Sequence, residues 1–288
     1  MSLKPLPKIQ CKAPVDSIRW DTPADAMTRW DASISARSDD TTITIYDAIG
    51  SDGWSDSGVT AKRISAALRS IGEREVTVSI NSPGGDFFEG LAIYNLLREH
   101  PHKVTVKVVG LAASAASIIA MAGDEIQVAK SGFLMIHNAW AYVAGNKKAM
   151  LGAADILDGF DKSMADIYAT VTDEDIKKIS EMMDSETWMT GQGAVDHGFA
   201  TGLLPSDEVV EGDGDRGAVA AVRKIDNILA KQGMRRAERK DLLNQIKGGT
   251  PGAAATVMPG ADLLVEIANR VEKSINEATH ERRTKRIN

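Results

Sequence analysis

Apolar and polar residues follow two different periods along the central part of the chain. Segments such as TTITIYD (41–47) place apolar residues at every second position and are rich in β-branched side chains, which predicts strands. The segments between them space apolar residues by three or four positions, which predicts helices, and the first of these ends at Gly72, a residue typical of helix C-caps. The predicted order is strand 41–47, helix 59–72, strand 75–81, helix 86–100, strand 103–110 and a helix from Ser114 onward.

This alternation predicts an α/β layered fold whose strands are mostly parallel. Further along, DEIQVAKSGFLMIH (124–137) predicts two short strands around a turn at 130–132. A long helical region at about 146–170 and a shorter one near 173–183 follow. Sites in parallel α/β sheets gather where strands lead into helices, and two glycine-marked turns stand at such points, SPGG (82–85) and GLAAS (110–114).

Both ends of the chain differ from this body, which we assign to residues 41–204. Residues 1–40 contain Trp20 and Trp30 but show no clear period, so we expect an N-terminal arm that packs on another surface, which the sequence does not identify. Residues 205–216 are acidic and glycine-rich, which is typical of a linker. Residues 217–288 predict a helical, basic and flexible C-terminal extension.

The extension carries apolar residues at helical spacing in two segments, and basic residues outnumber acidic ones between 217 and 247. The remainder of the chain is net acidic, so we expect the extension to dock onto an acidic partner or onto the body of the protein. We also expect it to be dispensable for hydrolysis of a short peptide.

Composition narrows the classes of protein. The formal net charge is −6, which gives no overall basic bias toward nucleic acid, and apolar residues make up 43% of the chain, enough for a core. Cys11 is the single cysteine, so no disulfide can form within the chain. The first ten residues lack the apolar segment of a signal peptide, and the apolar stretch 104–121 is interrupted by Lys107, glycines and serines. We therefore expect a cytoplasmic protein that binds neither membranes nor nucleic acid.

The most apolar predicted helix begins in GLAASAASIIAMAG (110–123), which contains two serines. A serine nucleophile needs a base, an acid that orients the base, and donors for the oxyanion. Ser114 stands at the predicted strand-to-helix junction among alanines, where a substrate backbone can approach and free helix N–H groups are available. Ser117 lies inside the helix, where its hydroxyl can bond back to a carbonyl. Taken alone, these residues leave open whether either serine is a nucleophile or a small core residue.

Histidine is the natural base for such a serine, and the chain contains five. His100 and His102 flank a proline in a polar turn and are expected to be solvated, and His280 lies in the charged tail. His137 differs because it ends the apolar strand GFLMIH and should point toward the edge of a site. A purely structural histidine is the alternative.

Four segments in this order and at these spacings resemble a known family. They are INSPGGDFFEGLAIYNLL (80–97), GLAASAASIIAMAGDEI (110–126), FLMIHNAW (133–140) and ETWMTGQGAVDHGFATGLL (186–204). Together they resemble the proteolytic subunit of Clp protease, a family of serine peptidases, over roughly residues 41–204. Within this family, the residues of the four segments resemble most those of phage and prophage members, which are taken to be head-maturation proteases. The resemblance implies a ClpP- or crotonase-like layered fold.

The resemblance also implies roles for individual residues. Ser114 matches the nucleophile and His137 the base, while the backbone N–H groups of Gly85 and Ala115 match the oxyanion hole. The family commonly places an aspartate two residues before the aromatic residue of the last motif. Here that position holds Glu186, which is our preferred acid, and Asp184 is its local alternative. A third possibility is that both carboxylates are exposed and a backbone carbonyl orients the histidine.

Partners and cofactors follow from the same resemblance. We expect a serine endopeptidase that forms a closed homo-oligomer, with the region 146–170 lying between rings, and that cleaves phage capsid or scaffold proteins in the host cytoplasm or within proheads. MIHNAW lacks the proline that housekeeping members carry after MIHQ, which argues against a Clp-type ATPase partner. No G-x-x-x-x-G-K-[ST] sequence is present, and we expect no ATP, cofactor or metal in the site.

The sequence also fits two other classes of protein. An enoyl-CoA hydratase-like enzyme shares the layered fold and also uses paired backbone N–H groups, but it does not require serine and histidine at these positions. A non-proteolytic assembly or scaffolding protein with a protease-like body would suit the charged C-terminal extension.

Overall fold

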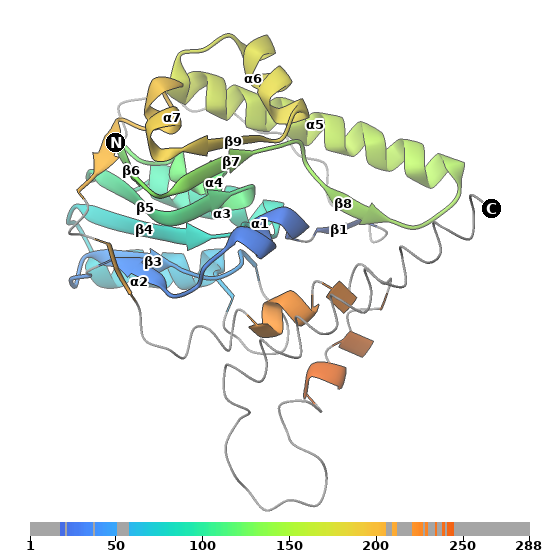
Figure 1. Ribbon diagram of the computed structural model, residues 1–288, viewed down its shortest axis with the longest axis horizontal. Coiled ribbons are helices and arrows are strands. Elements are labelled where there is room, and N and C mark those ends of the chain that lie inside the picture. The colour runs from blue at the N-terminus through green and yellow to red at the C-terminus, as the bar shows by residue number, and fades with distance from the viewer. Residues whose placement is uncertain are drawn as a thin grey trace, which may run out of the picture. The chain divides into compact units, whose positions relative to one another are not determined.

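Parallel strands form the central sheet of this protein, for which we describe a computed structural model (Figure 1). The strand order is β10–β6–β5–β4–β3, and every pair along this path is parallel. The strands are β3 (Thr42–Ile45), β4 (Val76–Ser82), β5 (Val104–Ala113), β6 (Glu125–Ala129) and β10 (Gly202–Leu204). The α/β class with mostly parallel strands that the sequence predicts is thereby confirmed.

The structure describes most of the body and scattered parts of the C-terminal region. The described residues are 18–20, 22–36, 38–50, 58–205, 209–211, 221–226, 228, 229, 234, 238, 239 and 241–244. The chain divides into two units between Glu211 and Gly212, which is inside the segment predicted as a linker.

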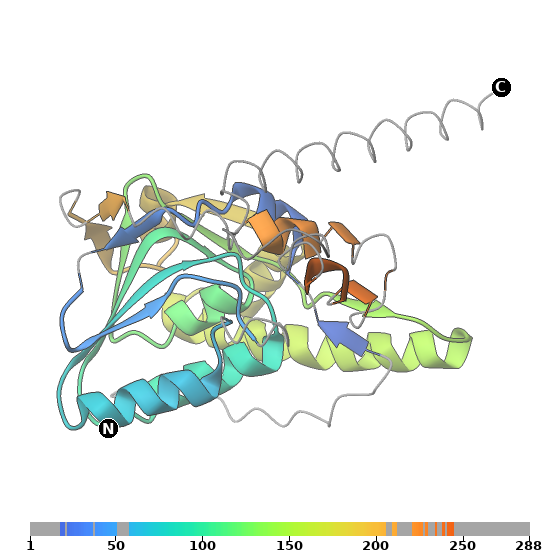
Figure 2. The same ribbon diagram turned by 90° about the horizontal axis from the view of Figure 1, so that it is seen from below.

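Helices cover the apolar face of the sheet. They are α2 (Ala61–Ile71), α3 (Phe87–Arg98), α4 (Ala115–Ala120), α5 (Lys147–Thr172), α6 (Ile176–Asp184) and α7 (Gly191–Asp196). Buried aliphatic residues at alternate positions of β3 to β6, such as Ile43, Val78 and Val106, form one core with buried residues of these helices. The predicted helix ends are also confirmed, since Gly72 caps α2 at φ 73° and the Asp86 side chain accepts the Glu89 N–H at the start of α3. Helix α5 runs past the end of the sheet in both views (Figures 1 and 2).

The long strand β5 has different neighbours along its two halves. Its first half pairs with β6 through Thr105–Val108, and its last residues, Leu111–Ala113, pair in parallel with β7 (Phe133–Ile136). Strand β9 (Thr187–Thr190) then pairs antiparallel with β7. The carboxyl ends of β5 and β7 consequently lie side by side, and Ser114 and His137 follow these two ends.

The described part of the N-terminal arm packs on the body and contains more regular structure than its sequence indicates. It forms β1 (Ile18–Trp20), α1 (Ala24–Arg29) and β2 (Ile34–Ala36), and β1 pairs antiparallel with β8 (Ala141–Val143). The buried Trp30 donates its indole N–H to the Asn81 carbonyl at 3.0 Å. With only six residues, α1 is too short to display a helical period, which explains why no sequence pattern predicts it.

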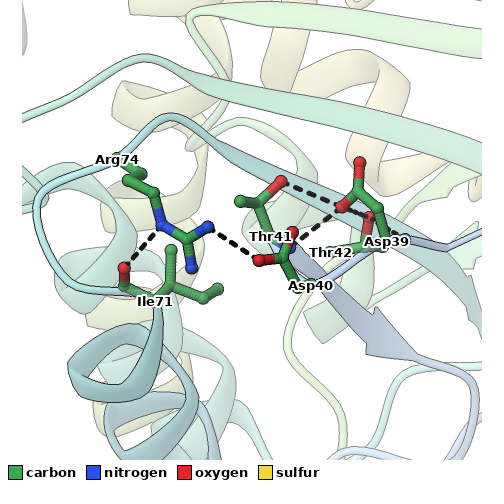
Figure 3. Close-up of polar contacts among 6 residues, drawn as sticks. All are labelled: Asp39, Asp40, Thr41, Thr42, Ile71 and Arg74. Carbon is green, nitrogen blue, oxygen red and sulfur yellow. Dashed lines mark hydrogen bonds and ion pairs between the residues drawn. The ribbon is translucent and has the colours of Figure 1, made fainter.

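A polar turn fixes the start of β3 against the end of α2 (Figure 3). Asp39 Oδ1 accepts the Thr42 hydroxyl at 2.8 Å and both the hydroxyl and the N–H of Thr41 at 2.9 Å. The bond from Thr42, followed by those from Thr41, lowers the pKa of Asp39. Beside this turn, the Arg74 guanidinium donates to Asp40 at 2.8 Å and to the Ile71 carbonyl at 2.9 Å, so the turn and the C-terminus of α2 are joined through polar contacts.

Part of the predicted linker is a strand. Residues Val209–Glu211 form β11, which pairs antiparallel with β2, and Val209 packs against a small cluster that contains Val109 and Leu204. In the second unit, residues 221–226 are helical and the predicted apolar positions Val222 and Ile225 are buried. The helix predicted after residue 261 lies outside the described residues. None of the helices in the described part of the chain combines the length and apolar character that a membrane crossing requires.

Candidate active site

Ser114 occupies a sharp turn between β5 and α4. It is the residue before α4, and its backbone has φ 54° and ψ −125°, a conformation that is uncommon for residues other than glycine. Such a conformation costs about 1–3 kcal/mol and persists only where the surroundings hold it. The Ser114 N–H donates to the Met135 carbonyl of β7 at 3.0 Å, so the neighbouring strand fixes the turn.

His137 lies within hydrogen-bonding distance of this serine. Because Ala113 pairs with Met135 in the parallel ladder, the residues that follow both strands emerge together, and His137 Nε2 lies 2.8 Å from Ser114 Oγ. Burial lowers the pKa of His137, and the charge of Glu186 opposes this by raising it. A histidine with a lowered pKa is neutral at pH 7 and can accept the proton of the hydroxyl.

The SPGG turn packs directly on the Ser114 turn. A Cβ atom added to Gly84, which has φ 88°, would fall 2.7 Å from Ser114 Cβ. The Ile49 N–H donates to the Gly84 carbonyl at 2.8 Å and the Asp86 N–H donates to the Ile49 carbonyl at 3.0 Å, so neither bond uses the Gly85 N–H.

Ala115 supplies a second backbone donor. It is the first residue of α4, where an N–H has no acceptor within the helix. The structure therefore brings the two predicted oxyanion donors, at Gly85 and Ala115, to the turns that flank Ser114.

The position of Glu186 follows from the antiparallel pairing of β7 and β9. Ile136 pairs with Thr187, so Glu186, the residue before β9, is next to His137. The half-buried Glu186 accepts the indole N–H of Trp188 on Oε1 at 3.1 Å. Among the residues that the structure describes, no hydrogen bond joins Glu186 to His137, so the carboxylate acts on the imidazole through its charge.

Asp184 is placed differently. It is exposed and accepts the side-chain N–H of Asn138 at 2.7 Å. Within the described ranges, the charge that raises the pKa of His137 is that of Glu186 and not that of Asp184, which favours Glu186 as the acid.

The surroundings of Ser117 indicate a structural role for its hydroxyl. Its side chain is fully buried, and its Oγ donates to the Ser114 carbonyl at 2.6 Å, as expected for a serine inside a helix. The same oxygen lies 2.8 Å from the hydroxyl of Tyr168 in α5. Of the two serines, the structure pairs Ser114 with the histidine and Ser117 with the helix core.

One expectation about the other histidines is wrong. His100 is buried rather than solvated, and its Nε2 lies 2.7 Å from the Arg74 carbonyl, because the segment after α3 folds back toward the end of α2. The His102 ring is 5.8 Å from the His100 ring. His197 is exposed, and His280 lies outside the described residues.

Asp161 is a residue near the site that the sequence did not single out. This half-buried side chain of α5 accepts the backbone N–H of Ala139 at 2.6 Å. Ala139 lies two residues after His137 in the sequence. Burial, with smaller effects from the charges of Asp158 and Asp184, raises its pKa from 3.8 to about 6. No local pattern marks this residue, because a lone aspartate in a helix is usually solvated.

Asp161→Asn is expected to stabilise the protein at pH 8. The folded state retains a proton on Asp161 between pH 3.8 and about 6, where the unfolded state has released it, so the free energy of unfolding falls as the pH rises through this window. Asparagine removes the cost of ionisation and keeps an oxygen for the Ala139 N–H. Since the group is partly exposed, we expect a gain of about 1 kcal/mol at pH 8 and no gain near pH 4.

Urea denaturation at the two pH values measures this difference. Asp166→Asn, at an exposed position of the same helix, is the matched control. A gain of the same size at both pH values would contradict the explanation.

The arrangement as a whole is one that serine hydrolases use. A serine stands on a strained strand-to-helix turn, a buried histidine lies 2.8 Å from its hydroxyl, and two backbone N–H groups flank it. Such a site can transfer an acyl group to serine and then to water.

Comparison with known proteins assigns the chain to one family. The model of the Clp protease family matches residues 26–207, more than half of the sequence, and the chain therefore belongs to the Clp protease family. The match begins inside the segment predicted as an N-terminal arm, in agreement with the packing of that segment on the body.

Individual relatives are similar at a moderate level. The chain is 30% identical over 137 residues to the ATP-dependent Clp protease proteolytic subunit 3 of Rhodococcus jostii, over 46% of this chain and 67% of that protein. It is 30% identical over 141 residues to the ATP-dependent Clp protease proteolytic subunit of Ligilactobacillus salivarius, over 48% of this chain and 72% of that protein. A solved structure of a ClpP1 mutant from Listeria monocytogenes matches with a TM-score of 0.49 and 23% identity, over 59% of this chain and 94% of that one.

Proposed function

We propose that this protein is a serine endopeptidase in which Ser114 is the nucleophile, His137 the general base and Glu186 the acid. The observation that carries the proposal is the 2.8 Å contact between Ser114 Oγ and His137 Nε2 at the ends of two adjacent parallel strands. Membership of the Clp protease family supports it.

The proposed reaction follows the order of acyl transfer to serine. His137 accepts the hydroxyl proton as Ser114 Oγ attacks the carbonyl carbon of the scissile bond, and the N–H groups of Gly85 and Ala115 donate to the oxyanion that forms. The imidazolium then protonates the leaving amine, which leaves an acyl group on Ser114. Water, deprotonated by His137, hydrolyses this ester. The Glu186 charge stabilises the imidazolium in both halves of the reaction.

We further propose that the substrates are capsid or scaffold proteins of a phage, cleaved in the cytoplasm of the bacterial host or within proheads. Two features support these substrates. The residues of the four site segments resemble those of phage members, and a long C-terminal region follows the part of the chain that matches the family. Co-expression with the capsid and scaffold genes of its own cluster, followed by mass spectrometry, tests it. We expect a cleaved capsid or scaffold product with the parent protein and none with Ser114→Ala. Intact capsid and scaffold proteins in both cultures would contradict the proposed substrates.

The protein is also proposed to work as a homo-oligomer, as members of its family do. Helix α5 extends beyond the sheet (Figure 1), and Met150 and Leu151 on it are 49% and 56% exposed. Large apolar side chains at the free end of a helix are suited to a subunit contact. Light scattering at micromolar concentration should give a mass several times that of the chain, and a monomer would contradict this proposal.

The C-terminal unit is proposed to be dispensable for hydrolysis of a short peptide. A chain that stops after Glu211 keeps β11, which pairs with β2, and ends at the division between the two units. We expect this truncated chain to cleave a short peptide at the rate of the full chain. Loss of the activity in a folded truncated chain would make the C-terminal unit part of the catalytic machinery.

A further inference from the structure

The Glu186 carboxylate needs a contact with another side chain to keep it beside His137. Its backbone has φ 46°, its side chain is only half-buried, and no hydrogen bond joins it to the imidazole within the described part of the chain. A glutamate side chain has several rotatable bonds, and an unrestrained carboxylate turns toward water, where its charge is screened. The contact that the structure provides is the indole N–H of Trp188, at 3.1 Å from Oε1.

Trp188 is in turn held from the other side by the N-terminal helix. The guanidinium carbon of Arg29, the last residue of α1, lies 4.5 Å from the centroid of the Trp188 ring. This distance is that of a cation–π interaction.

Packing alone does not fix the indole. Trp188 is half-buried and lines a pocket of about 190 Å³ together with Arg29, Leu111 and Phe133. The ring therefore borders open space, with the Arg29 guanidinium over its face and the Glu186 carboxylate at its N–H. The indole N–H can only donate, and its acceptor here is the Glu186 carboxylate.

We propose that Trp188 and Arg29 are positioning residues that hold the Glu186 carboxylate beside the His137 imidazole, so that helix α1 helps to order the active site. This inference rests on the proposed function, because it assigns a role to the acid of that same site. Among the described residues, neither Trp188 nor Arg29 forms a hydrogen bond with Ser114 or His137.

The pKa of His137, measured by NMR, reports directly on the position of the Glu186 charge. We propose to measure it in the full-length protein carrying Ser114→Ala, since no turnover is needed for this measurement. Glu186→Gln removes a charge that raises the pKa of His137, so the pKa should fall. Trp188→Phe keeps the aromatic ring but removes the donor, and it should lower the pKa of His137 in the same direction, because the released carboxylate turns toward water.

A double-mutant cycle separates positioning from general damage. If Trp188 acts through Glu186, then Trp188→Phe should have no further effect on the pKa of His137 once Glu186→Gln is present. Arg29→Gln should give a smaller decrease than Trp188→Phe, and Arg69→Gln, at an exposed position of α2, is the matched control that should give none. An unchanged or increased pKa in Trp188→Phe, or an equal decrease with and without Glu186→Gln, would overturn the inference.

Peptide kinetics in the protein with Ser114 intact then distinguish the inference from the proposed function. The acidic limb of kcat/KM should move to lower pH in Trp188→Phe and in Glu186→Gln, with KM little changed. If the parent protein hydrolyses no peptide but the pKa cycle behaves as expected, the proposed function fails and the positioning network stands. If the parent is an active peptidase and the pKa cycle shows no coupling, only the positioning inference fails. Arg29→Gln provides the same measurement should Trp188→Phe not fold.

Discussion

Ser114→Ala is expected to reduce turnover of a peptide substrate by about 10³-fold or more while the protein remains folded. Ser114 Oγ is the only atom removed, and it is the atom 2.8 Å from His137 Nε2. Without it no acyl-enzyme can form, and the residual rate comes from binding and from the backbone donors of Gly85 and Ala115. Steady-state kinetics with a fluorogenic peptide measure the effect, and circular dichroism checks the fold.

Ser117→Ala is the matched control for this experiment, because it removes a hydroxyl three residues along the same segment. Its loss removes the hydrogen bond to the Ser114 carbonyl, which still accepts the Ser117 backbone N–H at 2.9 Å, and takes a partner from the buried Tyr168 hydroxyl. This costs about 1–3 kcal/mol of stability. Turnover well below the melting temperature should stay within about tenfold of the parent value, since the oxygen does not face His137. Similar activity in both variants would remove Ser114 from the role of nucleophile.

Gly84→Ala is expected to have the second largest effect, on both stability and activity. The added Cβ would lie 2.5 Å from the Ala113 carbonyl oxygen and 2.7 Å from Ser114 Cβ, and φ at this position is 88°. These contacts involve the backbone and Cβ of the Ser114 turn, so neither can be relieved by a change of rotamer. We expect a loss of more than about 2 kcal/mol in the free energy of unfolding. The SPGG turn would also shift, and displacing the Gly85 donor should lower kcat by about 10²-fold or more.

Denaturation curves of the purified variant give its free energy of unfolding, and peptide kinetics give its kcat. Gly152→Ala in α5 is the control, because a Cβ at that position meets nothing within 4 Å. It should leave activity unchanged and increase stability by up to about 1 kcal/mol, as expected for glycine replaced in a helix. Parental activity and stability in Gly84→Ala would contradict the close packing of the two turns.

The alternation of strands and helices was predictable because β3, α2, β4, α3 and β5 each carry their own period. The strand β3 alternates, and α2 ends at a glycine with positive φ. The elements that could not be predicted are short or depend on a distant partner. Strand β8 forms because β1 pairs with it, and β11 forms because β2 does, although β11 lies in an acidic, glycine-rich segment.

The candidate site was predictable to the extent that local motifs define it. Ser114 and His137 each follow a recognisable strand, and the parallel pairing of β5 with β7 brings them together. The roles of Trp188, Arg29 and Asp161 depend on contacts across the fold. The sequence cannot show that a guanidinium from residue 29 stacks on an indole at residue 188, or that a helix carboxylate accepts the Ala139 N–H.

Covalent labelling tests most directly whether this protein is a serine peptidase. The full-length protein would be incubated with a fluorophosphonate, digested, and mapped by mass spectrometry. We expect the adduct on the peptide that contains Ser114, with no adduct in Ser114→Ala and slow labelling in His137→Gln, because the hydroxyl reacts only when a neighbouring base accepts its proton. A folded protein that stays unlabelled, or an adduct on another serine that persists in Ser114→Ala, would contradict the proposed nucleophile and the activity built on it.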